Sequence, residues 1–149
     1  MSKGGAAMSD AQNRNVNPED KRQYLGFIQD IISRMAGNSS SLKEWFAPIL
    51  TLVFAIAALK QEIRIYVFLA GLLVAVAFCF MDAQYLRLER AYRRLYTKAV
   101  AGDTRLYDLN PKPFDEGFRC YIKSLFSWSV LGYYGTLIIA GAIIYRFAF

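Results

Sequence analysis

Three long apolar runs constrain this chain more than any other feature. They cover residues 45–59, 65–81 and 122–145, and the third carries a single charge, Lys123, near its start. A helix of about 17–25 apolar residues crosses a bilayer. The chain is 55% hydrophobic, above the ~45–50% usual for soluble domains. These features predict an all-α integral membrane protein with three transmembrane helices.

The polar segments between the runs predict the remaining organisation. A short turn at 60–64 joins the first two runs into a transmembrane helical hairpin over residues 42–82. No helix breaker follows until Gly102, so the second span is predicted to extend into a long cytoplasmic helix. That helix and an aromatic-rich loop make up residues 83–121. Residues 122–149 then form the third transmembrane helix and a short outside tail, and residues 1–17 are predicted to be a disordered lead.

Residues 18–37 predict a cytoplasmic amphipathic helix. Asn17 can cap its N-terminus, and Pro18 suits the first helical position. Its apolar residues recur at three- and four-residue spacing: Tyr24, Phe27, Ile28, Ile31, Ile32 and Met35. Residues 37–38 (Gly-Asn) can end this helix, or one long helix can run through. The apolar face can pack against the protein's own membrane helices or a neighbouring subunit, lie in the lipid interface, or dock a partner.

The distribution of basic residues predicts the orientation in the membrane. Of 18 Lys and Arg residues, all but three lie in the N-terminal region or the 83–123 connection. Positive residues are retained on the cytoplasmic side. A multi-pass protein of the bacterial inner membrane is therefore expected, with its N-terminus in the cytoplasm and its C-terminus outside.

Basic residues after the second span form the candidate ligand- or anion-sensing set. Four lie in a stripe along the predicted cytoplasmic helix and three in the following loop: Arg87, Arg90, Arg94, Lys98, Arg105, Lys112 and Arg119. The stripe can be a solvated face near anionic lipid, a site for a phosphate-bearing nucleotide or nucleic acid, or a protein-docking face. The loop can pack on its own helices or form a ligand pocket that includes Tyr107.

The spans carry two further patterns. Small residues recur every four positions, which favours close helix packing within or between chains; the residues assigned to oligomer packing are Gly71, Ala75, Gly132 and Ala140. Hydroxyls on the third span form one polar stripe that could line a narrow path: Ser129, Tyr133 and Thr136. The alternative is that these hydroxyls bond to backbone or neighbouring helices. The three apolar runs carry no charge apart from Lys123 near the start of the third, which argues against proton relays and ion-coupled transport.

The composition also argues against catalysis. The chain has no His and two Cys, so the commonest acid–base group is missing and no four-ligand zinc set can be assembled. We expect no enzyme, no cofactor and no metal site.

Two blocks of sequence resemble a known type of small bacterial membrane protein. The first is the amphipathic segment 27–35, followed by residues 38–39 (Asn-Ser) and Lys-x-Trp at 43–45. The second is MDAQYLRLER at 81–90 with RRLY at 93–96. Over residues 24–100 the chain resembles the SLATT-type membrane effectors of nucleotidyltransferase-linked phage-defence systems, of the CBASS and Hailong kind. That resemblance implies an oligomer that stays closed until a cytoplasmic nucleotide or infection signal opens it. The third span departs from a two-span effector.

These observations predict an oligomeric inner-membrane pore or membrane-disrupting effector, gated by a cytoplasmic signal in anti-phage defence. The expected partners are the lipid bilayer, further copies in a homo-oligomer such as a tetramer, and a nucleotide, nucleic-acid or defence-protein trigger. The alternative is a non-conducting membrane anchor that recruits a cytoplasmic protein through Tyr85, Leu88 and Tyr92.

Overall fold

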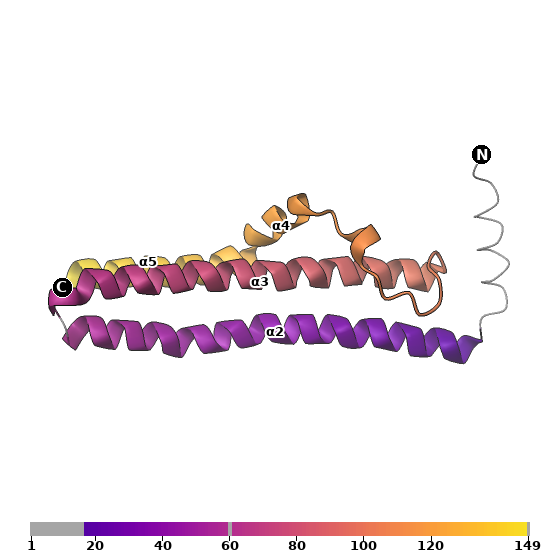
Figure 1. The fold of residues 1–149 in the computed structure, drawn as a ribbon, viewed down its shortest axis with the longest axis horizontal. Helices are drawn as coiled ribbons and strands as arrows, with labels where there is room; N and C mark the ends of the chain where they lie inside the picture. Colours follow the sequence, from indigo (N-terminus) through magenta and orange to yellow (C-terminus); the bar gives the residue numbers. More distant parts are fainter. Residues whose placement is uncertain (1–16, 60, 149) are drawn as a thin grey trace. The chain divides into compact units, whose positions relative to one another are not determined.

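The computed structural model describes residues 17–59 and 61–148, and this part of the chain is helical without any strand. The elements follow in the order α2 (Pro18–Leu59), the 3-10 turn η1 (Gln61–Ile63), α3 (Arg64–Ala101), the 3-10 turn η2 (Lys112–Phe114), α4 (Phe118–Leu125), the π-helical turn η3 (Trp128–Gly132) and α5 (Tyr133–Ala148) (Figure 1). The all-α fold class is confirmed for these residues. Apart from Asn17, the predicted disordered lead lies outside them.

Helix α2 begins where the sequence predicts but does not end there. The Asn17 side-chain carbonyl oxygen accepts a hydrogen bond from the Glu19 N–H at 3.1 Å, which is the expected N-terminal cap. Residues 37–38 (Gly-Asn) do not end the helix, which continues unbroken to Leu59. One interior Gly costs only about 1 kcal/mol relative to Ala, and tertiary contacts on either side outweigh that cost.

Helix α3 confirms the predicted continuation of the second span into a long helix. It ends at Ala101, where Gly102 takes a positive φ of 83°. The Gly102 N–H then bonds to the Ala99 carbonyl and the Asp103 N–H to the Lys98 carbonyl, both near 3 Å. This is a glycine-dependent helix end of the kind expected at this position.

The third apolar run lies largely within a candidate span, Phe118–Ile143, as the sequence predicts, but its helix is broken near the start. Helix α4 ends at Leu125, Ser127 is extended (ψ 144°), and the chain restarts as the π-helical turn η3 before α5. The Val130 and Leu131 N–H groups both bond to the Ser127 carbonyl, which fixes the new start. Val130 and Tyr134 are buried in a core, whereas Phe126 and Trp128 are exposed, so the break turns the two sets of side chains to different surroundings.

The chain divides into two compact units, and α2 and α3 each contribute to both. The loop unit combines the described residues up to Met35 with Leu88–Glu116. Its core is formed by Tyr24, Ile28, Leu95 and Ala99. The amphipathic face of the N-terminal helix therefore packs against the protein's own second helix, as one of the sequence interpretations expects.

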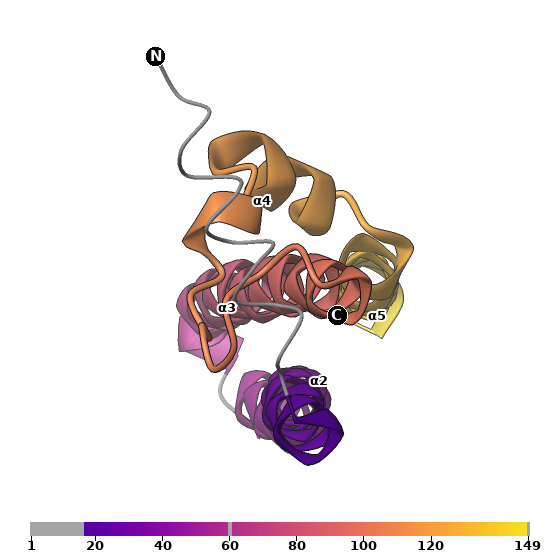
Figure 2. The ribbon, with the colours of Figure 1, turned by 90° about the vertical axis from the view of Figure 1, so that its right-hand side faces the viewer.

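The span unit combines Ala36–Arg87 with the described part of Gly117–Phe149. Its core is formed by Phe46, Ala75, Ala83, Val130 and Tyr134, which come from α2, α3, η3 and α5. Figures 1 and 2 both draw α5 beside α3. The third apolar run thus packs onto the hairpin.

Three stretches of the described chain are long and apolar enough to cross a membrane: Pro18–Ala57, Arg64–Ala101 and Phe118–Ile143. Their large apolar side chains are largely exposed, among them Trp45, Leu52, Tyr66, Leu73 and Ile139. Apolar surface on this scale is unusual in water and suits a hydrocarbon environment. The fold is compatible with a multi-pass membrane protein.

Gly71 should tolerate no side chain. A Cβ atom at this position would lie 2.7 Å from Val53 Cγ1, whereas one at Gly135 would meet nothing within 4 Å. We expect Gly71→Ala to lower the free energy of unfolding by about 1–3 kcal/mol, because Val53 is branched and cannot move aside freely. Thermal unfolding in detergent, followed by circular dichroism, measures this.

Two controls accompany that measurement. Gly135→Ala should unfold at or slightly above the parent temperature, and adding Val53→Ala to Gly71→Ala should restore part of the loss. Equal melting of the two glycine variants would contradict the close α2–α3 approach.

Candidate functional site

A charged network lies buried between α2 and α3 in the span unit. Asp82 is completely buried (0% exposed). Its Oδ2 atom pairs with the Lys43 Nζ atom at 2.6 Å, and the Lys43 side chain is only 19% exposed. The Ser39 hydroxyl donates to the other carboxylate oxygen, and Lys43 Nζ donates to Ser39 Oγ at 3.0 Å. We call Ser39, Lys43 and Asp82 the charged network.

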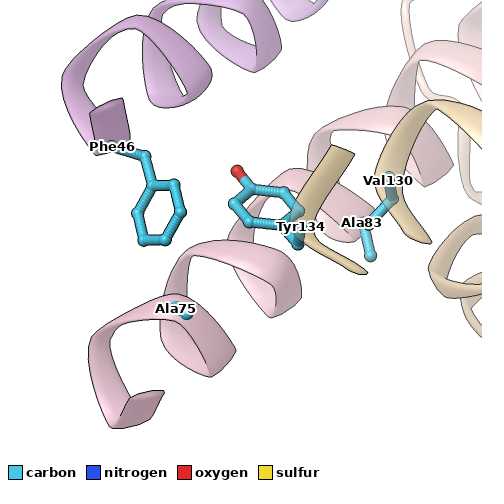
Figure 3. Packing of buried hydrophobic residues seen from close by; sticks show 5 residues of the cluster. All are labelled: Phe46, Ala75, Ala83, Val130 and Tyr134. Carbon is cyan, nitrogen blue, oxygen red and sulfur yellow. The ribbon is translucent and has the colours of Figure 1, made fainter. Parts of the chain in front are cut away.

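The third candidate span is attached at the same level through two tyrosines. The Tyr133 hydroxyl donates to the backbone carbonyl of Lys43 at 2.8 Å. The Tyr134 ring packs edge-on against Phe46, with ring centroids 5.3 Å apart (Figure 3). The Tyr134 hydroxyl is buried and has no hydrogen-bond partner among the described residues. One end of α5 is thus held against the segment of α2 that carries Lys43.

A buried ion pair holds helices together differently from apolar contacts. Desolvating two charges costs several kcal/mol each, and their attraction offsets this only in good geometry with further hydrogen bonds. Ser39 and the Lys43–Asp82 contact supply that geometry here. If the helices slide by a small amount, the carboxylate loses its partner while it is still buried, whereas full separation exposes it. Intermediate displacements are therefore the costly ones, and the network favours two states, joined or apart.

An apolar cavity lies next to the network in the span unit. It has a volume of about 30 Å³. Residues of α2, α3 and α5 line it, including Phe46, Val53, Gly71, Leu137 and Gly141. The polar groups of the charged network therefore lie on one side of Phe46, and the packing on the other side of Phe46 is apolar.

Sequence reasoning overlooked the charged network because it placed Lys43 and Asp82 at the ends of apolar runs. A signal was present in the chain. Each residue lies about 20 positions from the short turn around Glu62, so the two arms of a hairpin bring them level. Opposite charges at equal distance from a tight turn predict a contact.

The predicted path residues lie in two different kinds of backbone. Ser129 belongs to the π-helical turn, whereas Tyr133 and Thr136 belong to α5. The Thr136 hydroxyl donates to the Gly132 and Tyr133 carbonyls at 2.8 and 2.9 Å. Tyr133 donates to Lys43, as described above. Within one chain, the hydroxyls of Tyr133 and Thr136 therefore have hydrogen-bond partners. By exposure the division is different: Ser129 and Thr136 are exposed and Tyr133 is partly buried.

The four residues assigned to oligomer packing have different surroundings. Gly71 and Ala75 are buried inside the span unit, where Gly71 faces Val53. Gly132 lies beside the Trp128 ring: a Cβ atom added at Gly132 would be 3.6 Å from the nearest ring atom. Ala140 is exposed. Gly71 and Ala75 thus serve packing within the chain, and Ala140 stays accessible to a second chain.

The seven predicted sensing residues are divided between the units: Arg87 and Arg119 belong to the span unit and the other five to the loop unit. Arg94 donates to the Phe114 carbonyl at 3.0 Å and pairs with Glu116 at 3.1 Å. Lys98 pairs with Asp103 at 3.0 Å. Part of the basic stripe therefore fastens the following loop to α3. Arg105, Lys112 and Arg119 are exposed.

The loop itself packs on helices of the loop unit. Leu106, Leu109 and Phe114 lie against the core of that unit. The Tyr24 hydroxyl donates to the Asp108 carbonyl at 2.6 Å. The sequence leaves two interpretations of this loop open, and the observed packing corresponds to the one in which it packs on the protein's own helices. Phe118, which follows this loop at the start of α4, is by contrast exposed.

Tyr107 occupies a strained position on the loop surface. Its φ of 62° lies in the left-handed region, which a bulky residue rarely adopts. Its hydroxyl donates to Gln23 Oε1 at 3.0 Å, and its ring meets those of Tyr24 and Phe27. Desolvation and the nearby Asp20 carboxylate raise the pKa of Tyr107 above its ordinary value. Strain retained at an exposed aromatic residue is typical of functional surfaces.

Comparison with protein-family models, curated proteins and solved structures gave no match. The resemblance to SLATT-type effectors therefore rests on the quoted motifs alone. Within residues 17–59 and 61–148, no three His, Cys, Asp or Glu side chains are placed to hold a metal ion.

Removing one partner of the charged network should destabilise the span unit strongly. We expect Asp82→Asn to lower the free energy of unfolding by about 3–5 kcal/mol, because it leaves a largely buried ammonium without its counter-charge. The double variant Lys43→Met with Asp82→Leu should recover most of the loss. A thiol-reactive dye during heating reports unfolding through the free cysteines Cys79 and Cys120.

The exposed pair Lys98–Asp103 is the matched control, because its side chains are 54% and 55% exposed. Lys98→Gln should change stability by less than about 1 kcal/mol. If Asp82→Asn were as mild as this control, the network would not hold the helices together.

Proposed function

We propose that this protein is an oligomeric membrane pore, or a membrane-permeabilising effector, in which the charged network latches the closed state. The observation that supports this proposal is the burial of Asp82 against Lys43, at the level where Tyr133 also attaches α5. Ionisable residues buried between membrane helices are costly, and they usually mark a functional element. A latch of this kind gives the joined and separated states that gating needs.

The conducting path in this proposal uses the exposed hydroxyl residues of the third segment. Ser129 and Thr136 lie on the accessible side of η3 and α5. Copies of this segment around a symmetry axis, in a tetramer or another closed ring, would place their hydroxyls along a shared path. Ala140, small and exposed on the same helix, would allow the copies to approach closely.

The trigger in this proposal acts on the loop unit from the cytoplasm. In this proposal the loop unit faces the cytoplasm of a bacterial inner membrane, which is supported by the basic residues concentrated in this part of the chain. Helices α2 and α3 are unbroken and belong to both units, which gives a covalent route from the loop unit to the charged network. A nucleotide, nucleic acid or defence protein that binds Arg105, Lys112 or Tyr107 would then bias the latch, as in anti-phage defence.

The exposed aromatic pair Phe27 and Tyr107 favours a second candidate function, a non-conducting anchor that recruits a cytoplasmic protein. Both side chains are more than two-fifths exposed, and Leu88 of α3 is also exposed. Tyr85 and Tyr92, the other proposed docking residues, are partly buried. This candidate needs no path through the membrane.

Dye or potassium release from liposomes should separate the two candidates. Purified Asp82→Asn protein is expected to release the contents faster than the parent without any trigger, because the closed state loses its ion pair. The swapped pair, Lys43→Asp with Asp82→Lys, keeps opposite charges in contact and should restore the slow parental rate. Ser39→Ala removes two hydrogen bonds but keeps the Lys43–Asp82 ion pair, so it should give an intermediate rate.

Helical content measured by circular dichroism checks that each variant is folded. Folded Asp82→Asn protein that releases no faster than the parent and the swapped variant would overturn the pore proposal. A soluble protein that co-purifies with the parent and is lost on Phe27→Asp and Leu88→Asp would then support the anchor. Particle mass in nanodiscs adds an independent test, since a monomer is incompatible with a symmetric path.

A further inference from the structure

Helix α4 presents a surface that neither candidate function uses. Cys120 and Ser124 are buried on one side, and Tyr121 stacks on Phe80 of α3 with ring centroids 6.4 Å apart. The opposite side is exposed and combines basic with aromatic residues: Phe118, Arg119, Lys123, Phe126 and Trp128. We call these five residues the α4 face. Trp128 is 90% exposed, the highest value among the large exposed hydrophobic residues of the described chain.

The composition of the α4 face is that of a membrane–water boundary. Trp and other aromatic rings prefer the headgroup level, where one side of the ring is apolar and the other is hydrated. Lys and Arg beside them reach lipid phosphates while their stems cover apolar surface. Two exposed basic residues with three exposed aromatic residues on about three turns of chain fit this pattern.

The position of the α4 face along the chain fits the same boundary. The break at Ser127 separates α4 from the apolar α5, so α4 lies at the end of a candidate span. In Figures 1 and 2, α4 is set off from α5 and is not a straight extension of it. The break lets α4 lie at an angle to the span, and it explains why a run predicted as one helix is divided here.

The charge of this segment selects the kind of lipid. From Gly117 to the end of the sequence there is no Asp or Glu. Arg119 and Lys123 are both exposed, so the α4 face presents two basic side chains that complement an anionic headgroup.

We infer that the α4 face binds anionic phospholipid through Arg119 and Lys123, with Phe118, Phe126 and Trp128 seated among the headgroups. This inference rests on membrane insertion and not on conduction. It assigns α4 the role of a lipid-sensitive entry to the third span, so the lipid composition around the protein fixes the depth at which η3 begins.

Trp128 provides the probe for the test. The chain has two Trp residues, so Trp45→Phe leaves Trp128 as the single fluorophore. This parent is reconstituted in vesicles that contain acyl-brominated phosphatidylglycerol or brominated phosphatidylcholine at the same mole fraction. The relative association constant follows from the two quenching curves. We expect a preference of roughly three- to tenfold for phosphatidylglycerol, at a few-fold per basic residue near the surface.

Two variants assign that preference. In Arg119→Gln with Lys123→Gln, the ratio should fall to about one, because both basic residues of the face are removed. Arg146→Gln, which changes an exposed basic residue near the other end of α5, should leave the ratio unchanged. All three changed positions are exposed, and circular dichroism checks that helical content is retained.

Each remaining outcome counts against the inference. Equal quenching by the two lipids would show a face without charge selectivity. A preference retained in the double variant would place the lipid contact elsewhere. Trp128 quenched by aqueous acrylamide but by neither lipid would show a face outside the bilayer, and shielding from all three quenchers would show a protein cover such as a second copy. These results are independent of liposome leakage, so the pore proposal can fail while this inference stands.

Discussion

The contact between Lys43 and Asp82 sets the alignment on which the span unit depends. The buried carboxylate favours the register of α2 against α3 in which it meets Lys43, because a slip would separate this pair. The close approach of Gly71 to Val53 belongs to the same register and would be lost with it. Tyr133 then adds the third segment by bonding to the carbonyl of Lys43 itself. The relative positions of the three helices therefore depend on the Lys43–Asp82 contact. Small residues such as Gly71 allow the helices to come close, but they do not determine the register.

Different kinds of contact stabilise each of the two units internally, although the same two helices, α2 and α3, contribute to both. In the loop unit, a core of Tyr24 and Leu95 is covered by a loop whose hydrogen bonds and ion pairs resemble those of a soluble domain. Exposed ion pairs such as Lys98–Asp103 contribute little to stability. In the span unit, apolar side chains face outward and the buried contacts are small residues and aromatic rings. This contrast is what a chain needs if one unit is surrounded by water and the other by lipid.

Features set by local sequence could be predicted, and features set by tertiary contacts could not. The Asn17 cap, the end of α3 at Gly102 and the hairpin turn each depend on a few neighbouring residues, and each was predicted in place. The passage of α2 through residues 37–38 was left open, because the helix propensity of Gly and Asn is a weak preference that packing overrides. The break at Ser127 is not predicted, since hydropathy alone does not distinguish Val130, which is buried in the core, from Trp128, which is exposed. The burial of Asp82 was missed because it requires the register of the hairpin.

The distribution of polar groups along the spans constrains how any path through this protein could open. Ser39, Lys43, Asp82 and Tyr133 gather at one level, and the packing beyond Phe46 is apolar. The described core of one chain therefore offers an ion no polar group beyond that level, and a path lined by the exposed Ser129 and Thr136 has to form between chains. Turning individual hydroxyls such as that of Thr136 would not be enough, since it already bonds to its own helix. In the proposal, opening has to break both the Lys43–Asp82 pair, which joins α3 to α2, and the Tyr133–Lys43 hydrogen bond, which joins α5 to α2.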